Sequence, residues 1–178
     1  MPDALRTRDL IEEGRRSQAD LPPLRRIVVA LDPIVTTGDD SGETGTIVAG
    51  HGVDDHGYVL EDASGRFSPI EWARRAVALY LNLKWGADRI VAEANQRGLM
   101  VEQTVRTVDQ TVSFKSVHPS RGKVMRAEPI AALFEQSRVH LAGSFAEVED
   151  ELCTFAQAAS PECTSRAPGS RTPHPRRS

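Results

Sequence analysis

The feature that most constrains the fold is an unbroken apolar run, residues 27–31, which ends in an acid and a proline, Asp32 and Pro33. A continuous apolar run that follows charged residues is typical of a strand buried on both faces. Pro33 has no backbone N–H to continue the ladder, so the strand should end there. The pattern therefore predicts a central strand that carries the carboxylate of Asp32 where the chain leaves the core.

A second run, residues 89–95, repeats this design, because its apolar residues are followed by Glu93. If the two strands are neighbours, their ends lie about 5 Å apart. The carboxylates of Asp32 and Glu93 could then hold the same metal ion or pair of ions.

Composition limits the remaining classes of function. A chain of 178 residues suits one domain with a real core, and its net charge of −3 provides no general basic field for nucleic acid. Cys153 and Cys163 lack metal-ligand spacing, which argues against a disulfide framework and a zinc site. Aromatic residues make up only 5%, so a base-stacking surface is not expected. The histidines show no triad or ligand spacing and are expected at ordinary surface or strand positions.

The ends of the chain are expected to lie outside the folded domain, which we place at residues 25–156. Residues 1–24 are predicted to be a linker, or a short helix that packs on something outside this chain. Residues 157–178 lack periodicity and are predicted to be a disordered tail. The sequence shows no signal-peptide pattern and no long apolar span, which predicts a soluble protein of the cytoplasm with no membrane partner.

The middle of the chain predicts alternating elements. Residues 44–53 and 58–67 have strand character and are joined by a turn with Gly57, so the first three strands should form an antiparallel meander. Helices and single strands then alternate to the end of the domain. This order indicates an α/β fold with a mixed sheet and helices on both faces.

Two helix starts are predicted from capping boxes. Ser68 and Glu71 form the first, and Pro69 suits the first turn that follows. Ser144 and Glu147 form the second.

One local basic cluster contains Arg121, Lys123 and Arg126 around a glycine, Gly122. Glycine lets the backbone approach a phosphate closely, and the cations supply charge. A DNA contact and a solvated loop are both open interpretations. A helix should follow the cluster, with Pro129 in its first turn.

The element order matches the ribonuclease-H-like arrangement, in which acids at the ends of the first and fourth strands meet at one edge of the sheet. Asp32 and Glu93 occupy those two places. Phosphodiester hydrolysis at such a site can use two divalent cations about 4 Å apart. Mg²⁺ prefers oxygen ligands, which carboxylates supply.

The sequence resembles the C-terminal nuclease domain of the large terminase subunit of tailed phages and related gene transfer agents. The resemblance covers about residues 25–160 and rests on five segments: residues 28–33, 43–48, 72–73, 91–96 and 121–129.

This resemblance implies a Mg²⁺- or Mn²⁺-dependent endonuclease that cuts concatemeric double-stranded DNA during capsid packaging in the host bacterial cytoplasm. Asp32 and Glu93 would be its first two metal ligands, and Arg121, Lys123 and Arg126 would lie in its DNA-binding stretch. The implied partners are the terminase ATPase domain, the small terminase subunit and the portal.

Two departures from the family pattern affect activity. The sequence has no phosphate-binding Gly-rich loop, so this chain should not power DNA translocation by itself. The family's third acid is expected on a helix after residues 160–162, where the sequence instead becomes rich in Arg, Pro and Ser, as after a change of reading frame. The acids at 149–151 are either substitutes for it or the solvated face of the last helix.

Three functions remain open from the sequence. The chain is a metal-dependent endonuclease of reduced activity, a catalytically inactive remnant that binds DNA or a packaging protein, or another ribonuclease-H-like nuclease such as a resolvase.

Overall fold

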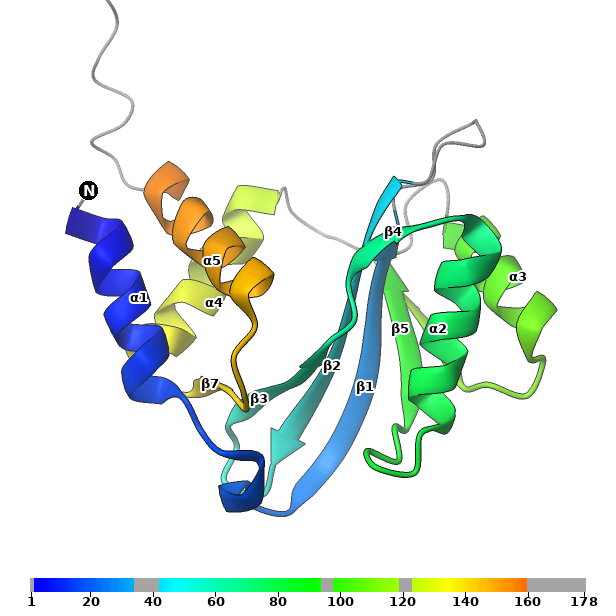
Figure 1. The fold of residues 1–178 in the computed structure, drawn as a ribbon, viewed down its shortest axis with the longest axis horizontal. Helices are drawn as coiled ribbons and strands as arrows, with labels where there is room; N and C mark the ends of the chain where they lie inside the picture. Colours follow the sequence, from blue (N-terminus) through cyan, green and yellow to red (C-terminus); the bar gives the residue numbers. More distant parts are fainter. Residues whose placement is uncertain (1, 34–41, 94–97, 119–122, 160–178) are drawn as a thin grey trace, which may run out of the picture.

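The computed structural model describes residues 2–33, 42–93, 98–118 and 123–159. Within these ranges the chain forms a seven-stranded mixed sheet with five α-helices and one short 3-10 helix (Figure 1). The strands are β1 (Leu24–Pro33), β2 (Gly42–Gly52), β3 (Gly57–Asp62), β4 (Gly65–Phe67), β5 (Arg89–Glu93), β6 (Phe114–Val117) and β7 (Val139–Leu141). The helices are α1 (Pro2–Gly14), the 3-10 helix η1 (Gln18–Asp20), α2 (Pro69–Leu81), α3 (Gly98–Val108), α4 (Lys123–Glu135) and α5 (Ala146–Ala159).

The strand order is β6-β5-β1-β2-β3-β7, and β4 pairs separately with β2. Strands β1, β2 and β3 form the predicted antiparallel meander. Strands β5 and β6 continue the sheet parallel to β1, and β7 lies parallel to β3. The mixed α/β sheet expected from the sequence is therefore confirmed.

The third predicted strand, residues 58–67, is wrong in one respect because it is divided into β3 and β4. The carboxylate of Asp62 accepts a hydrogen bond from the backbone N–H of Ser64 at 2.9 Å, and the Ser64 hydroxyl accepts one from the N–H of Thr46 at 3.0 Å. The N–H of Thr46 thus bonds to a side chain, while its carbonyl still accepts a backbone hydrogen bond from the N–H of Ala63 at 2.8 Å. The chain bends there, and β4 pairs with the start of β2.

One face of the sheet is covered by α2 and α3. Helix α2 packs on β1 and β5, and α3 packs on β5 and β6. Val29 and Ile90 from the strands and Trp72 from α2 are at most 3% exposed in the core between these layers. Trp72 is thus a core residue, as expected for a large aromatic at helical spacing.

The two predicted capping boxes have different outcomes. At the start of α2, Glu71 accepts a hydrogen bond from the backbone N–H of Ser68 at 2.8 Å, so this box is confirmed. At the start of α5, the N–H of Phe145 donates instead to Glu149 at 2.9 Å. The second box is therefore wrong, because α5 begins at Ala146, directly after Phe145, and the carboxylate that bonds back to the helix start is that of Glu149.

The prediction for Pro129 is also wrong. Helix α4 begins at Lys123, so Pro129 lies inside the helix and not in its first turn. The basic segment itself starts the helix, which the proline pattern alone did not indicate.

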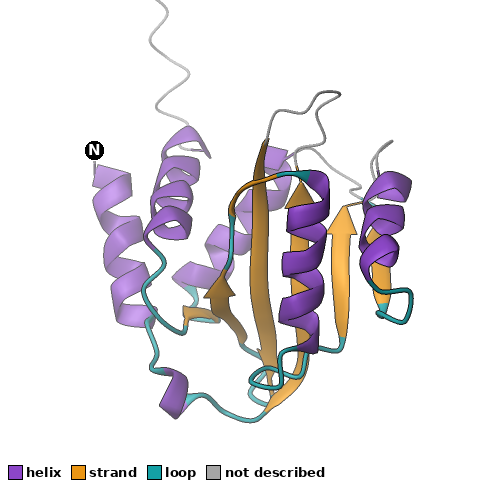
Figure 2. Cartoon of the chain, turned by 45° about the vertical axis from the view of Figure 1, so that its right-hand side comes forward, coloured by secondary structure: helices purple, strands orange, loops and turns teal. Residues whose placement is uncertain are grey.

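A second group of helices, α1, α4 and α5, lies at the other end of the sheet from α2 and α3 (Figures 1 and 2). Helices α1 and α4 pack against β7, and α1 also packs along α5. Ile11 of α1 is 1% exposed in a cluster with Leu141 and Cys153. The N-terminal segment therefore forms a helix that packs on other parts of this chain. No helix among the described residues is long and apolar enough to cross a membrane.

Candidate active site

The two predicted acids follow a pair of residues that are neighbours in the sheet. Leu31 on β1 pairs with Ala92 on β5 in parallel register. Asp32 and Glu93 are the next residues on their strands, so both stand at the carboxyl edge of this strand pair. The structure thus brings the two predicted acids to adjacent positions.

Asp32 and Glu93 also share a face of the sheet. Leu31 and Ala92 are 3% and 4% exposed and lie in the core under α2 and α3. Because successive side chains of a strand alternate between faces, Asp32 and Glu93 stand on the opposite face. Asp32 is exposed and Glu93 is partly exposed. A ligand approaching this face would meet both side chains.

Gly45 connects this edge to a neighbouring pocket. It lies directly opposite Asp32 on β2. A methyl group on Gly45 would stand 3.8 Å from Cβ of Asp32, which shows that the two positions share a face. Gly45 also lines a pocket between β2, β3 and α5, so Asp32 stands beside that pocket.

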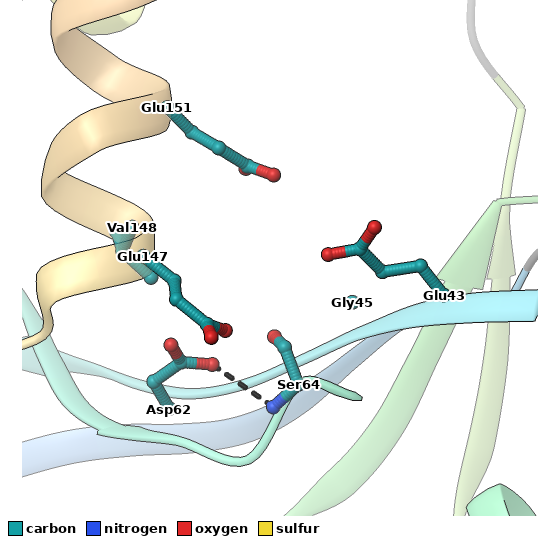
Figure 3. A pocket seen from close by; sticks show the side chains of 7 residues that line it. All are labelled: Glu43, Gly45, Asp62, Ser64, Glu147, Val148 and Glu151. Atoms are coloured by element: carbon teal, nitrogen blue, oxygen red, sulfur yellow. Dashed lines mark hydrogen bonds between the residues drawn. The ribbon is translucent and has the colours of Figure 1, made fainter. Parts of the chain in front are cut away.

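The pocket is acidic. Figure 3 shows carboxylates from three elements directed toward a common space. They belong to Glu43 on β2, Asp62 at the end of β3, and Glu147 and Glu151 on α5. Arg66 on β4 is paired across the strands with Glu43 on β2, so one arginine lies next to this acidic group. The edge of the sheet beside Asp32 is therefore rich in oxygen ligands.

The three acids at 149–151 face three different directions. Glu149 is 7% exposed and bonds to Arg15 at 2.9 Å, and the Arg15 hydrogen bond holds the pKa of Glu149 below its usual value. Asp150 pairs with Arg8 at 2.6 Å on the surface. Glu151 lines the pocket. The interpretation of all three as a solvated face is therefore wrong for Glu149, since α1 covers it.

The predicted basic residues follow the neighbouring strand. Strand β6 pairs with β5 up to Glu93 and Val117, so the chain leaves β6 at the same edge as Glu93. Lys123 and Arg126 lie in the first two turns of α4, which comes next in the chain. Arg121 lies outside the described residues.

The donor set fits one hard divalent cation. Asp32 and Glu93 supply carboxylate oxygens, and Mg²⁺ is commonly held by one or two carboxylates, with water and substrate phosphate completing its shell. Within the described part of the chain, no group of three or more His, Cys, Asp or Glu residues is close enough to hold a metal ion. The two acids therefore match the chemistry of the ion, while a third ligand has no fixed place among these residues.

Comparison with known families decides what kind of domain this is. The model of the terminase RNaseH-like domain matches residues 29–170, which is most of the chain. The chain belongs to this family. No curated protein matches the sequence.

Solved terminase nuclease structures share the fold. The human cytomegalovirus terminase nuclease domain is 17% identical with a TM-score of 0.55, over 83% of this chain and 82% of that one. A K428A mutant nuclease domain of the large terminase subunit gp2 of bacterial virus Sf6, solved with manganese and beta-thujaplicinol, is 13% identical with a TM-score of 0.57, over 84% and 80%. The large terminase nuclease from thermophilic phage G20c, with bound magnesium, is 16% identical with a TM-score of 0.50, over 84% and 78%. At these identities the likeness shows the fold alone.

Sequence reasoning missed the acidic pocket. The signal was present in part, because Glu43 and Gly45 alternate on β2 and must share a face once Gly45 is placed opposite Asp32. Glu147 and Glu151 are four residues apart and must share a face of α5. What the sequence did not contain was the position of α5 across the pocket from Glu43 and Asp62.

Proposed function

We propose that this chain is the metal-dependent DNA endonuclease domain of a terminase large subunit, with Asp32 and Glu93 as its metal ligands. The observation that supports this most directly is the parallel register of β1 and β5, which sets both acids on one face at one edge. The family assignment supports it further, since the similar solved structures are terminase nucleases and two of them contain manganese or magnesium.

Each residue has a defined role in the proposal. The carboxylates of Asp32 and Glu93 hold a Mg²⁺ or Mn²⁺ ion on two adjacent strands, whose backbone ladder fixes their positions. The bound ion would supply the charge stabilisation that phosphodiester hydrolysis needs, and the family chemistry uses two such ions. Arg121, Lys123 and Arg126 contact the phosphate backbone of double-stranded DNA next to this edge.

The third carboxylate decides how active the chain is. Of the three α5 acids named from the sequence, Glu151 is the one that lines the pocket, because Glu149 and Asp150 are bonded to arginines of the N-terminal region. We assign the substitute role to Glu151. A glutamate that must extend across the pocket holds an ion less firmly than an acid fixed on a strand, so weak cleavage is the expected activity.

The proposed partners follow from the family. The domain would act on DNA that a terminase ATPase domain moves into a capsid, together with a small terminase subunit and a portal, in the cytoplasm of a host bacterium. Phage and gene transfer agent particles both provide this setting.

Plasmid nicking with Mn²⁺ tests the proposal. Wild type, Asp32→Asn and Glu93→Gln are compared, and Asp20→Asn on η1 serves as a matched control because this exposed acid precedes the first residue of β1, whereas Asp32 lies near its last. Wild type and the control should nick at equal rates. The two site variants should lose nicking and bind Mn²⁺ at least about tenfold more weakly, since even residues that only orient metal ligands are worth that much.

A non-cleaving remnant is the second candidate, and it is favoured by the lack of a three-ligand group in the described residues. Equal nicking by wild type and Asp32→Asn, with DNA binding retained, would establish it. Preference for a four-way junction over linear duplex would instead favour a resolvase activity.

A further inference from the structure

A buried histidine on β7 joins three segments that are far apart in the sequence. His140 is 2% exposed. Its Nδ1 lies 2.8 Å from the carbonyl oxygen of Gly14 at the end of α1. Its Nε2 lies 2.9 Å from Nδ1 of His56 in the turn between β2 and β3. One imidazole thus connects the N-terminal helix, the hairpin and the sheet edge.

These contacts fix which nitrogens carry protons. The carbonyl of Gly14 can only accept, so Nδ1 of His140 must donate. In the neutral ring Nε2 of His140 is then an acceptor, and Nδ1 of His56 must donate to it. A neutral His56 could also hold its proton on Nε2 and accept at Nδ1, so a single proton between the two facing nitrogens keeps the bond. Protons on both facing nitrogens would place two donors against each other.

The surroundings of His140 disfavour its charged form. Burial lowers its pKa, and the positive charges of Arg16 and His56 lower it further, whereas the Gly14 carbonyl and Asp54 act in the opposite direction. The ring of Tyr58 stacks on His140 with centroids 5.2 Å apart. The Tyr58 hydroxyl donates a hydrogen bond to the Asp54 carboxylate at 2.6 Å. The same carboxylate oxygen lies 3.9 Å from Nδ1 of His56.

We infer that His56 and His140 form a pH-sensitive latch that holds the carboxyl-terminal end of α1 against the β3–β7 edge. At neutral pH the chain of donors from His56 through His140 to Gly14 is complete, and the latch is closed. When Nε2 of His140 and Nδ1 of His56 both carry protons, two donors face each other, the bond is lost and a charge is buried. The end of α1 then separates from β7, which lets water reach the imidazolium.

The latch has a consequence for the acidic pocket. Helix α1 packs along α5 and bonds to it through Arg15 and Glu149. Opening of the latch removes a support of α5, which carries the pocket residues Glu147 and Glu151. Low pH therefore loosens α5 before the sheet itself unfolds.

Hydrogen exchange on the full wild-type chain tests this inference at pH 7.5 and 5.5. Protection factors, corrected for intrinsic exchange, are measured for α1 and for β5 as the internal reference. An open-state histidine with an ordinary pKa near 6.5 gains a proton in this range, so α1 protection should fall about tenfold at pH 5.5 while β5 is unchanged. Equal protection of α1 at both pH values would overturn the latch.

Variants assign the effect to His140. His140→Gln keeps one donor and one acceptor but cannot titrate, so α1 protection should become independent of pH. His118→Gln, which removes an exposed imidazole beyond β6, is the matched control and should behave as wild type. If His140→Gln does not fold, imidazole ¹⁵N shifts of the wild-type protein replace it. The loss of α1 protection must then have the same midpoint as the protonation of His140, and a midpoint below pH 4.5, in the carboxylate range, would reject the latch.

Discussion

Arg15 and Glu149 form an ion pair that joins the two ends of the described chain, with Nη1 and Oε1 2.9 Å apart. The Glu149 side chain is 9% exposed, and Arg15 also donates to the carbonyl of Gly143 and to Glu12. Helix α1 is thereby held on α5 by a network that is largely withdrawn from water. Residues 1–24 were predicted as a linker or short helix, and this network makes the helix part of the packed structure.

Replacing Glu149 should destabilise the chain measurably. Glu149→Gln removes the charge that faces Arg15 in a largely buried position, and hydrogen bonds to charged groups contribute about 1.5–3 kcal/mol. We therefore expect the free energy of unfolding to fall by roughly 1–3 kcal/mol in urea denaturation. Asp150→Asn on the same helix is the matched control, because its pair with Arg8 is exposed and should have little effect. Equal losses for both variants would contradict the prediction.

The Arg15–Glu149 pair also makes the stability of the fold depend on pH, and the direction of the pKa shift of Glu149 gives the sign of this dependence. The Arg15 hydrogen bond holds the pKa of Glu149 in the folded state below its ordinary value of 4.5. A depressed folded-state pKa means that the stabilisation is present above pH 4.5 and is lost as pH falls below it. Wild type should lose its stability advantage over Glu149→Gln as pH drops from 5 to 3, measured by thermal unfolding. A difference that stays constant through this range would show that Glu149 is not linked to folding.

Most of the fold followed from local sequence signals. The apolar run of β1 and the alternating strands of the hairpin are determined by which side chains are buried, and burial leaves a clear pattern in the sequence. The packing of α1 left a weaker pattern. Among residues 8–14 of this helix, whose burial the structure describes, Ile11 is the one fully buried apolar residue, and a single residue does not establish a helical apolar face.

The adjacency of the two candidate metal ligands was predictable as far as it depends on strand ends. Asp32 and Glu93 each end an apolar run, and the parallel register that makes them neighbours follows from the order of elements. The pocket that Glu147 and Glu151 share with Glu43 was not predictable, because it depends on where α5 lies relative to β2. From the sequence, Glu151 was only one of three neighbouring acids that were either substitutes for the third ligand or a solvated face. His56 and His140, expected at ordinary positions, form a direct bond for the same reason: no local pattern reports a contact between residues 84 positions apart.

The basic start of α4 should contribute to DNA binding in a way that depends on salt. Lys123→Ala combined with Arg126→Ala removes two cations from the helix that follows the Glu93 edge. Each lost phosphate contact should reduce the slope of log K against log[salt] by about 0.9. Fluorescence anisotropy with a duplex oligonucleotide measures this slope. Arg74→Ala on the exposed side of α2 is the control, and an identical slope for all the proteins would exclude α4 from the DNA contact.

Glu151 provides the test of whether α5 can supply a metal ligand. Glu151→Gln keeps the size of the side chain and removes one charge from the pocket beside Asp32, whereas Asp150→Asn removes one charge from the adjacent exposed position. If Glu151 is the third carboxylate, the first variant should bind Mn²⁺ several-fold more weakly in electron paramagnetic resonance titrations, with unchanged thermal stability, and its residual nicking should fall further. Because both variants change the net charge equally, a general electrostatic effect would weaken binding equally in both. Equal binding by Glu151→Gln and Asp150→Asn would therefore leave the centre with Asp32 and Glu93 alone and remove α5 from the metal site.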